Sequence, residues 1–317
     1  MTAAKHHTAP VAADTFKAFS ATDASVLAGI PALIWPAWFL PERFWPAICR
    51  NLSPLAISDL THEPQAAAEL IRRTLGTRLP EVAGTEILRD MGAEGIFTFF
   101  QVLKCHRPDH WAPAARLVHA DRIARALEYG RGVILWVAHA FHGHLGAKVA
   151  FGQAGLKVCH LSRPNHGFSS TRFGVRYLNR IQTIVEDRHI AERVMLPMEG
   201  QNTALHMIVR RLRRNGVVSI TAQRGIARTV DAPFLNGKLT LAPGAPTLAH
   251  MTGATLLPVF AFRDENNVVE VRVGSPLEVD TAAPREQAVR DVVRRYAPIL
   301  EADVLRYPGQ WLGWVQL

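Results

Sequence analysis

The chain has 317 residues, of which 48% are hydrophobic and 20% charged, so it can bury a substantial core and is not a disordered protein. Its 36 Lys and Arg exceed its 27 Asp and Glu, and the formal net charge of +9 favours an anionic partner: a phospholipid surface, a phosphorylated cofactor, an acidic carrier protein or nucleic acid. No nucleic-acid-binding motif accompanies the charge, so we expect no nucleic-acid partner. The three cysteines lack metal-binding or redox spacing, which fits free thiols in a reducing compartment.

The N-terminal part of the chain is irregular at first and then strongly apolar. Residues 1–20 are small and polar, and we expect a mobile tail. Residues 24–41 contain no charged residue, but Pro31 and Pro36 interrupt them. Tryptophan favours the membrane–water boundary, and three tryptophans lie close together here, at Trp35, Trp38 and Trp45. We interpret residues 1–57 as a flexible tail and a shallow, membrane-associating segment, with a buried core helix or a true membrane span as the alternatives.

A histidine cluster follows the first clear strand. Residues 58–130 have apolar residues at helical spacing, but Val133–Val137 is a short, β-branched apolar run that predicts a buried strand of a parallel sheet. This run leads into His139, and His142 and His144 follow. Because ligands of open α/β sheets bind at the carboxyl ends of strands, we expect His139 to lie in the functional site. Its imidazole suits a general base for a hydroxyl or an amine, and a hydrogen-bonded structural histidine is the alternative.

The spacing of the three histidines differs from that of zinc ligands. Zinc-binding histidines on a helix are usually four residues apart, whereas the offsets here are three and two. No cysteine or carboxylate lies nearby in the sequence to complete the ligand set. We therefore predict no metal site.

Predicted strands and helices alternate through the rest of the chain. A helix from about 172 to 180 and another from 202 to 214 carry several arginines. Further helices are predicted at 145–154, 245–251 and 285–306, and strands at 157–161, 181–186, 217–222, 256–262 and 268–273. This alternation predicts an α/β fold, with a mostly parallel central sheet flanked by helices, and residues 58–317 are interpreted as a single domain.

Several sequence blocks, in their order and spacing, resemble a known family. These blocks are the strand ending in His139, the Arg163-Pro164 loop, the Gln223 loop with PFLNGK, the GATLLPV strand and the terminal YPGQW. They resemble the lipid A late (lauroyl/myristoyl) acyltransferases, which belong to the lysophospholipid acyltransferase superfamily. The similarity spans nearly the whole chain and implies a glycerol-phosphate acyltransferase-like fold.

The resemblance implies a reaction and a location. A fatty acyl group would move from an acyl carrier protein or coenzyme A thioester to a hydroxyl of a membrane lipid, at the cytoplasmic face of the inner membrane, with no metal or tightly bound cofactor. His139 matches the family's general base. By the same resemblance Arg163 would contact a phosphate or a carrier head group, and Gln223, Arg224 and the backbone around Gly237 would line the site.

The chain departs from the family where the acidic partner of the base should stand. Five residues after His139 the family has Asp or Glu, which orients the imidazole and stabilises its positive charge, but this chain has His144. A neutral His144 could hold the tautomer of His139 but could not neutralise an imidazolium. Another acid would have to reach His139 through space, and Glu186, Asp187 and Asp231 are the candidates.

Two further expectations depend on these departures. The family's usual PEQW reads Pro308-Gly309-Gln310-Trp311 here and lacks the basic residues that normally follow, which favours a lipid acceptor less phosphorylated than a lipid A precursor. The alternative to an active enzyme is a catalytically silent member of the fold that binds a lipid or a carrier protein.

Overall fold

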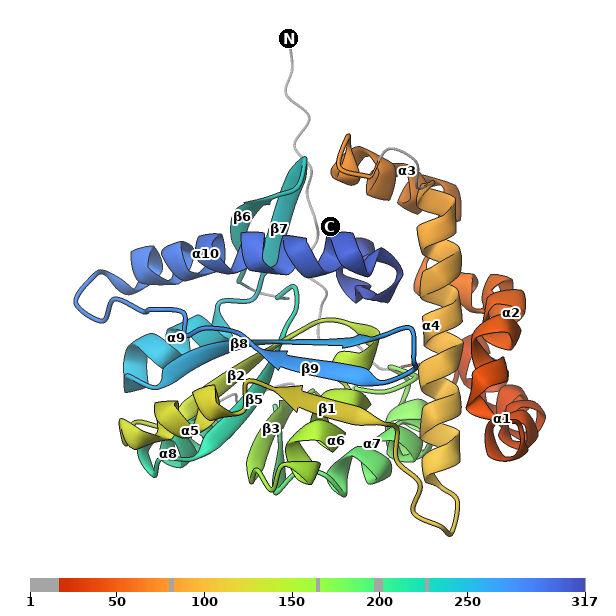
Figure 1. The fold of residues 1–317 in the computed structure, drawn as a ribbon, viewed down its shortest axis with the longest axis horizontal. Coiled ribbons are helices and arrows are strands. Elements are labelled where there is room, and N and C mark those ends of the chain that lie inside the picture. The colour runs from red at the N-terminus through yellow and green to blue at the C-terminus, as the bar shows by residue number, and fades with distance from the viewer. Residues whose placement is uncertain (1–16, 80–82, 164–165, 197–201, 226–227, 317) are drawn as a thin grey trace.

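The computed structural model describes residues 17–79, 83–163, 166–196, 202–225 and 228–316, so most of the predicted tail lies outside the described residues. The described chain forms a seven-stranded sheet in the order β1-β9-β8-β2-β5-β3-β4, with helices packed against it (Figure 1). The predicted α/β class with a mostly parallel sheet is confirmed.

The central strand of the sheet is β2 (Val133–Ala138). It pairs in parallel with β8 (Thr255–Arg263) on one side and with β5 (Val217–Ala222) on the other. Beyond β5 follow β3 (Val158–Ser162) and β4 (Glu192–Met195), also parallel. Beyond β8, β9 (Val269–Val273) is antiparallel, and β1 (Ala115–Val118) pairs in parallel with β9. The carboxyl ends of β2, β5 and β3 therefore meet at one edge.

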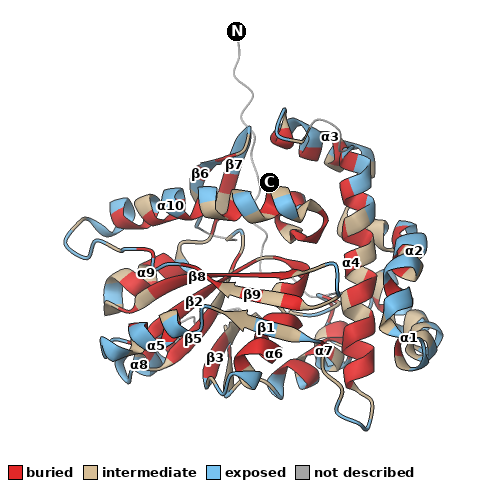
Figure 2. Ribbon diagram, viewed as in Figure 1, coloured by how far each residue is buried: buried red, intermediate tan, exposed pale blue. Residues whose placement is uncertain are grey.

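Both faces of β2 are buried, which explains its uninterrupted apolar sequence. Ile134, Trp136 and Ala138 belong to one hydrophobic cluster, and the alternate residues Val133, Leu135 and Val137 belong to another on the opposite face. Trp136 packs against Tyr296 with 4.3 Å between ring centroids. Figure 2 shows the buried interior of the sheet between exposed outer helix faces.

Helices cover both faces of the sheet. Side chains of α8 (Asn202–Arg213), α9 (Gly244–Thr252) and α10 (Arg285–Arg306) pack in the first cluster, and those of α5 (Asp121–Glu128) and α6 (Leu145–Gln153) in the second. The first cluster also receives α3 (Pro64–Leu75) and α4 (Gly84–Cys105). The cysteines are free and buried, as the sequence indicated.

The N-terminal helices α1 (Ala21–Phe39) and α2 (Trp45–Leu60) pack on α4, outside the sheet (Figure 1). Trp45 is buried against Phe97 and Phe100, with ring centroids 5.5 and 5.3 Å away. In contrast to the buried Trp45, the α1 residues Trp35 and Phe39 are 65% and 66% exposed. Within the described residues, no helix has the combined length and apolar character needed to cross a bilayer.

Two predictions about local structure were wrong. Residues 181–186 belong to the helix α7 (Asn179–Asp187) and not to a strand, because their buried side chains recur at helical spacing, at Gln182, Val185 and Glu186. The loop that contains PFLNGK is a hairpin of β6 (Val230–Phe234) and β7 (Gly237–Leu241). The region 58–130 is mainly helical, as its apolar spacing predicts, but it also contains the short strand β1.

Candidate active site

A cavity of about 490 Å³ opens where β2, β5 and β3 end. His139 enters it after β2, Gln223 after β5 and Arg163 after β3. These residues are far apart in the sequence but come from neighbouring strands. Three of the predicted site residues therefore share one lining, as the strand-end rule for parallel sheets indicates.

His144 also lines this cavity, whereas the two remaining predicted residues do not. Arg224 is exposed, one residue beyond Gln223. Gly237 begins β7, and its backbone lies next to the side chain of Thr74 of α3. The hairpin contributes instead through Leu239 and Leu241, which close a narrow apolar recess against His139.

His139 is held by its backbone and has an enclosed ring. Its carbonyl oxygen accepts a hydrogen bond from the Leu312 amide at 3.0 Å, and Ala140 forms a β-bridge with Trp311. Its Nδ1 atom is buried and has no hydrogen-bond partner among the described residues. Burial, together with His166 and Arg163, lowers the pKa of His139 to about 4. The imidazole is therefore neutral near pH 7, and Nε2 is the nitrogen left to face a substrate.

His144 does not supply the support that a carboxylate would give. Its ring centroid is 5.7 Å from that of His139, and no hydrogen bond joins the two rings in the described structure. Burial, followed by His166 and His139, places the pKa of His144 well below its usual value. The ring is therefore neutral and cannot offset a positive charge on His139.

Glu186 is the only buried carboxylate of the three candidates. Its side chain is 0% exposed, and its oxygens lie 3.0 Å from His166 Nε2, 3.1 Å from Lys148 Nζ and 2.7 Å from Arg193 Nη2. Gln182 donates a fourth contact at 2.8 Å. Burial alone would raise the pKa of Glu186, but Lys148, His166 and Arg193 outweigh it and hold the pKa well below its usual value.

The other two candidate acids lie elsewhere. Asp187 pairs with Arg193 and is 47% exposed, and Asp231 pairs with Lys238 in the hairpin. None of the three candidates has a contact with His139 in the described structure. The expectation that one acid reaches His139 directly is therefore not met.

Two further histidines of the cavity were not singled out from the sequence. His160 lies within β3 and His166 follows it, and both line the cavity. His160 Nδ1 lies 2.7 Å from Ser219 Oγ of β5. His166 is adjacent to His144, with 5.1 Å between ring centroids. The same strand-end rule, applied to β3 as well as to β2, could have found His166.

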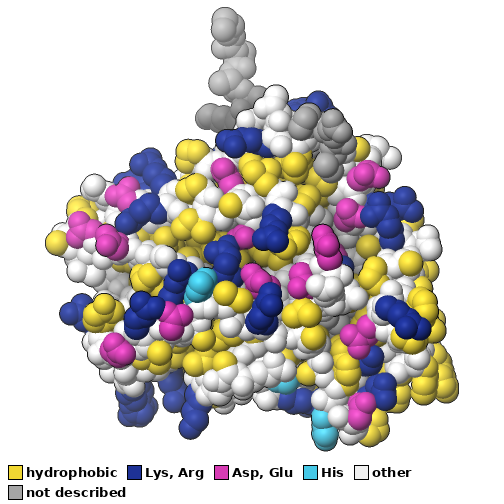
Figure 3. Space-filling model, viewed as in Figure 1, with side chains coloured by type: hydrophobic (Ala, Val, Ile, Leu, Met, Phe, Trp, Pro, Cys, Tyr) yellow, Lys and Arg dark blue, Asp and Glu magenta, His cyan; other side chains and the backbone are white. Residues whose placement is uncertain are grey.

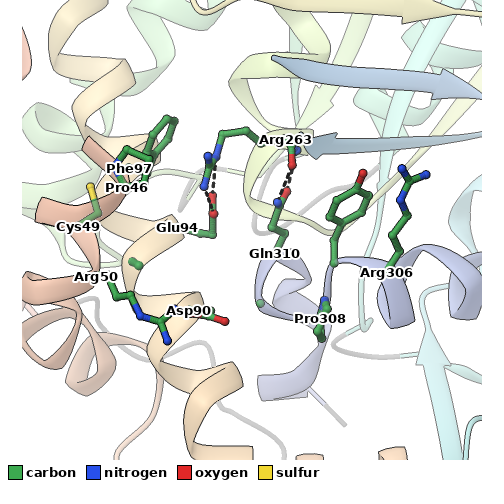
Figure 4. Close-up of a pocket in the computed structure, with 13 residues that line it drawn as sticks. Pro46, Cys49, Arg50, Asp90, Glu94, Phe97, Arg263, Arg306, Pro308 and Gln310 are labelled. Atoms are coloured by element: carbon green, nitrogen blue, oxygen red, sulfur yellow. Dashed lines mark hydrogen bonds and ion pairs between the residues drawn. The ribbon is translucent and has the colours of Figure 1, made fainter. Parts of the chain in front are cut away.

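A second histidine–carboxylate pair lies on the other side of the histidine loop. His142 Nε2 is 2.8 Å from an oxygen of Glu94, a buried residue of α4, and Glu94 also forms an ion pair with Arg263 at the end of β8 (Figure 4). A separate cavity of about 310 Å³ lies beside this ion pair. His142 itself is 1% exposed.

The terminal YPGQW block has a structural role in this region. The Gln310 side chain accepts a hydrogen bond from the Arg263 amide at 2.7 Å and donates one to the Arg263 carbonyl at 2.8 Å (Figure 4). Trp311 then pairs with Ala140. The block thus connects the end of β8 to the segment that carries His139.

Among the residues that the structure describes, no set of three or more His, Cys, Asp and Glu side chains is arranged to hold a metal ion.

The mostly parallel sheet places the imidazole of His139 at the end of its central strand, in a cavity that also contains the guanidinium of Arg163. Such an α/β protein is suited to proton transfer beside an anionic group. The model of one family, described as bacterial lipid A biosynthesis acyltransferase, matches residues 22–316. The chain belongs to this family of acyltransferases, which confirms the resemblance seen in the sequence. No curated protein matches the chain.

Proposed function

We propose that the protein moves a fatty acyl group from the thioester of an acyl carrier protein or coenzyme A to a hydroxyl of a lipid acceptor. The observation that carries this proposal is the position of His139, at the carboxyl end of β2 in a cavity that also contains Arg163. The family supports acyl transfer to a lipid, and the site residues and the donor are our assignment.

His139 is the general base of the proposed reaction. Its neutral Nε2 takes the proton of the acceptor hydroxyl while the oxygen attacks the thioester carbonyl. The tetrahedral intermediate then collapses with cleavage of the C–S bond, and the departing thiolate receives the proton. Gln223 lines the same cavity, and its amide donates a hydrogen bond to the oxyanion in this proposal.

Arg163 is the proposed anion contact. It lines the cavity and is half-buried, and burial lowers the pKa of its guanidinium without making it neutral. A guanidinium binds a phosphate through two parallel hydrogen bonds, so a phosphate of the donor or of the lipid head group fits here. The apolar part of the lining would hold the acyl chain, and it consists of Leu161, Leu196, Ile220, Ala242 and Leu312.

We propose that the protein binds peripherally to the cytoplasmic face of the inner membrane through α1 and α2. Exposed fractions of 47% to 73% are found for Trp35 and Phe39 of α1, for Leu55 of α2 and for Phe44 of the short helix η1 (Glu42–Phe44) between them. Hydrophobic side chains are visible at the edge of the molecule that these helices form (Figure 3). Exposed aromatic residues beside an overall positive charge favour an anionic lipid surface.

The test is an acyl-transfer assay on vesicles that contain hydroxyl-bearing lipids. Labelled acyl groups are supplied on acyl carrier protein in one arm and on coenzyme A in the other, with wild type and His139→Ala. His250→Gln is the matched control, because His250 lies on α9 and contacts the Ala283 carbonyl, outside the cavity. We expect His139→Ala to lower kcat by about 10²–10⁴-fold, the usual contribution of a general base.

Two results would count against the proposal. Transfer that is unchanged in His139→Ala would remove this residue from the mechanism. A folded wild type that binds lipid or carrier but transfers no acyl group to any acceptor would favour the catalytically silent alternative.

A further inference from the structure

Proton transfer at His139 lacks an acid that could stabilise the product. The Nδ1 atom of His139 is buried and unpartnered among the described residues, and this is the atom that an orienting carboxylate would normally contact. His144 stands at the carboxylate position of the motif but is itself an imidazole. An imidazolium formed at His139 would therefore be enclosed without a neutralising group.

The rings of His139, His144 and His166 form a series of neighbours, and the series ends at a carboxylate. The centroids of His139 and His144 are 5.7 Å apart, and those of His144 and His166 are 5.1 Å apart. His166 Nε2 then lies 3.0 Å from both oxygens of Glu186. All three rings line the same cavity.

The environment of Glu186 is suited to receive a positive charge at His166. Two cations, Lys148 and Arg193, contact Glu186, and Asp187 also pairs with Arg193. Two carboxylates thus balance two cations, and the group carries no net charge while His166 is neutral. A proton on His166 would rest beside an ionised carboxylate, whereas a proton on His139 would not.

We propose that Glu186 replaces the motif carboxylate and acts on His139 through His166 and His144. This inference rests on the proposed acyl transfer. His139 takes the hydroxyl proton on Nε2 and releases one from Nδ1 to His144, which passes one to His166. His139 and His144 end neutral, and His166 ends as an imidazolium held by Glu186. When the C–S bond breaks, one proton returns through the same rings to the thiolate. His144, His166 and Glu186 are positioning residues and do not touch the reacting atoms.

The pair formed by His142 and Glu94 cannot serve this purpose. Within the described structure, Glu94 contacts His142 and Arg263 but none of the three rings of the relay. His142 does not line the 490 Å³ cavity, and it is 1% exposed. Of these two histidine–carboxylate pairs, His166 and Glu186 is therefore the one that borders the cavity.

The decisive experiment restores the motif carboxylate with His144→Glu. In the wild-type background, we expect Glu186→Gln and His166→Asn each to lower kcat by about 10-fold or more, with KM little changed. In the His144→Glu background the carboxylate stands next to His139, so the same two substitutions should lower kcat by less than about 3-fold. A purely structural role for Glu186 would give equal losses in both backgrounds.

The variant His166→Asn keeps the test informative if Glu186→Gln fails to fold. Glu186→Gln leaves Lys148 and Arg193 without a charged partner and can destabilise the fold, whereas His166→Asn keeps both ion pairs. His250→Gln is again the control for histidine replacement. Wild-type kcat in both His166→Asn and Glu186→Gln, or equal losses in the two backgrounds, would overturn the relay and leave the proposed function standing.

A second measurement separates the relay from the proposed function. Histidine titrations by NMR, on labelled protein without substrate, report whether the rings are coupled. We expect His166→Asn to raise the titration midpoint of His139, because a proton on His166 opposes a proton on His139. If wild type transfers no acyl group, the proposed function fails, and an unmoved His139 midpoint would overturn the relay as well.

Discussion

Two histidine–glutamate pairs flank the same segment of chain, and they differ in what surrounds them. His142 and Glu94 are enclosed between α4 and the end of β8, where Arg263 completes the charge balance. His166 and Glu186 also form a close contact, but the His166 ring lines the 490 Å³ cavity beside His144. The residue types and the distances are nearly the same. Access to the cavity is what distinguishes a structural pair from one that can take part in proton transfer.

The largest expected effect comes from removing the carboxylate of the enclosed pair, His142 and Glu94. Glu94→Gln leaves Arg263 and His142 without their acid in a buried setting, and we expect a loss of about 3–5 kcal/mol in the free energy of unfolding. Urea unfolding measures this loss. Asp90→Asn is the control, because Asp90 pairs with Arg50 at the surface, with both side chains more than 40% exposed, and should lose at most about 1 kcal/mol.

The same variant also separates stability from catalysis. Measured on folded protein, Glu94→Gln should reduce acyl transfer less than Glu186→Gln does. If the two glutamate variants lose transfer equally, exposure to the cavity does not decide which pair is functional.

The second prediction concerns acid stability and the open cavity. The folded-state pKa of His139 is about 4, whereas the unfolded value is near 6.5, so between these values the unfolded chain binds the extra proton. The free energy of unfolding should therefore fall as the pH decreases from about 6.5 towards 4, and His139→Gln should make the fall less steep. Denaturant unfolding at several pH values between 7.5 and 4.5 would show this, and an unchanged slope in His139→Gln would contradict the lowered pKa.

The third prediction concerns the binding of an anionic substrate in the 490 Å³ cavity. Arg163→Gln removes a charge-assisted contact of about 1.5–3 kcal/mol, so KM for the donor or acceptor that carries the phosphate should rise by about 10-fold or more. Arg213→Gln is the matched control, since Arg213 is an exposed arginine of α8 outside the cavity lining. Equal effects of the two substitutions would reduce the role of Arg163 to general surface charge.

The smallest expected effect concerns the membrane-facing edge. Trp35→Ser removes an aromatic ring that is 65% exposed on α1, and we expect a several-fold decrease in sedimentation with anionic vesicles. Tyr129→Ser, at the end of α5, removes a side chain that is 73% exposed and should leave vesicle binding unchanged. Equal losses would place the binding surface elsewhere.

Long periodic segments and strand ends were predictable from the sequence. The buried run that became β2 and the helix Arg285–Arg306 were found because their apolar patterns are uninterrupted. The strand-end rule placed His139 in the site, and the family resemblance implied Arg163 and Gln223, which line the same cavity. The segment 181–186 was assigned to the wrong class because six residues with the β-branched apolar side chains Ile181, Ile184 and Val185 are too few to distinguish a strand from one face of a helix.

What the sequence determined by itself is the fold class and the edge of the sheet where the chemistry lies, since both depend on hydrophobic periodicity and on short connections between strands and helices. It also established that the usual acid is missing after His139. Only the tertiary structure distinguished the acids, because Glu186 contacts a histidine that lines the cavity and Glu94 contacts an enclosed one. Glu186 and Glu94 are both glutamates on helices, and burial, the facing cations and access to the cavity arise from elements that are distant in sequence. Such long-range packing sets the environment of a charged group, and no local pattern encodes it.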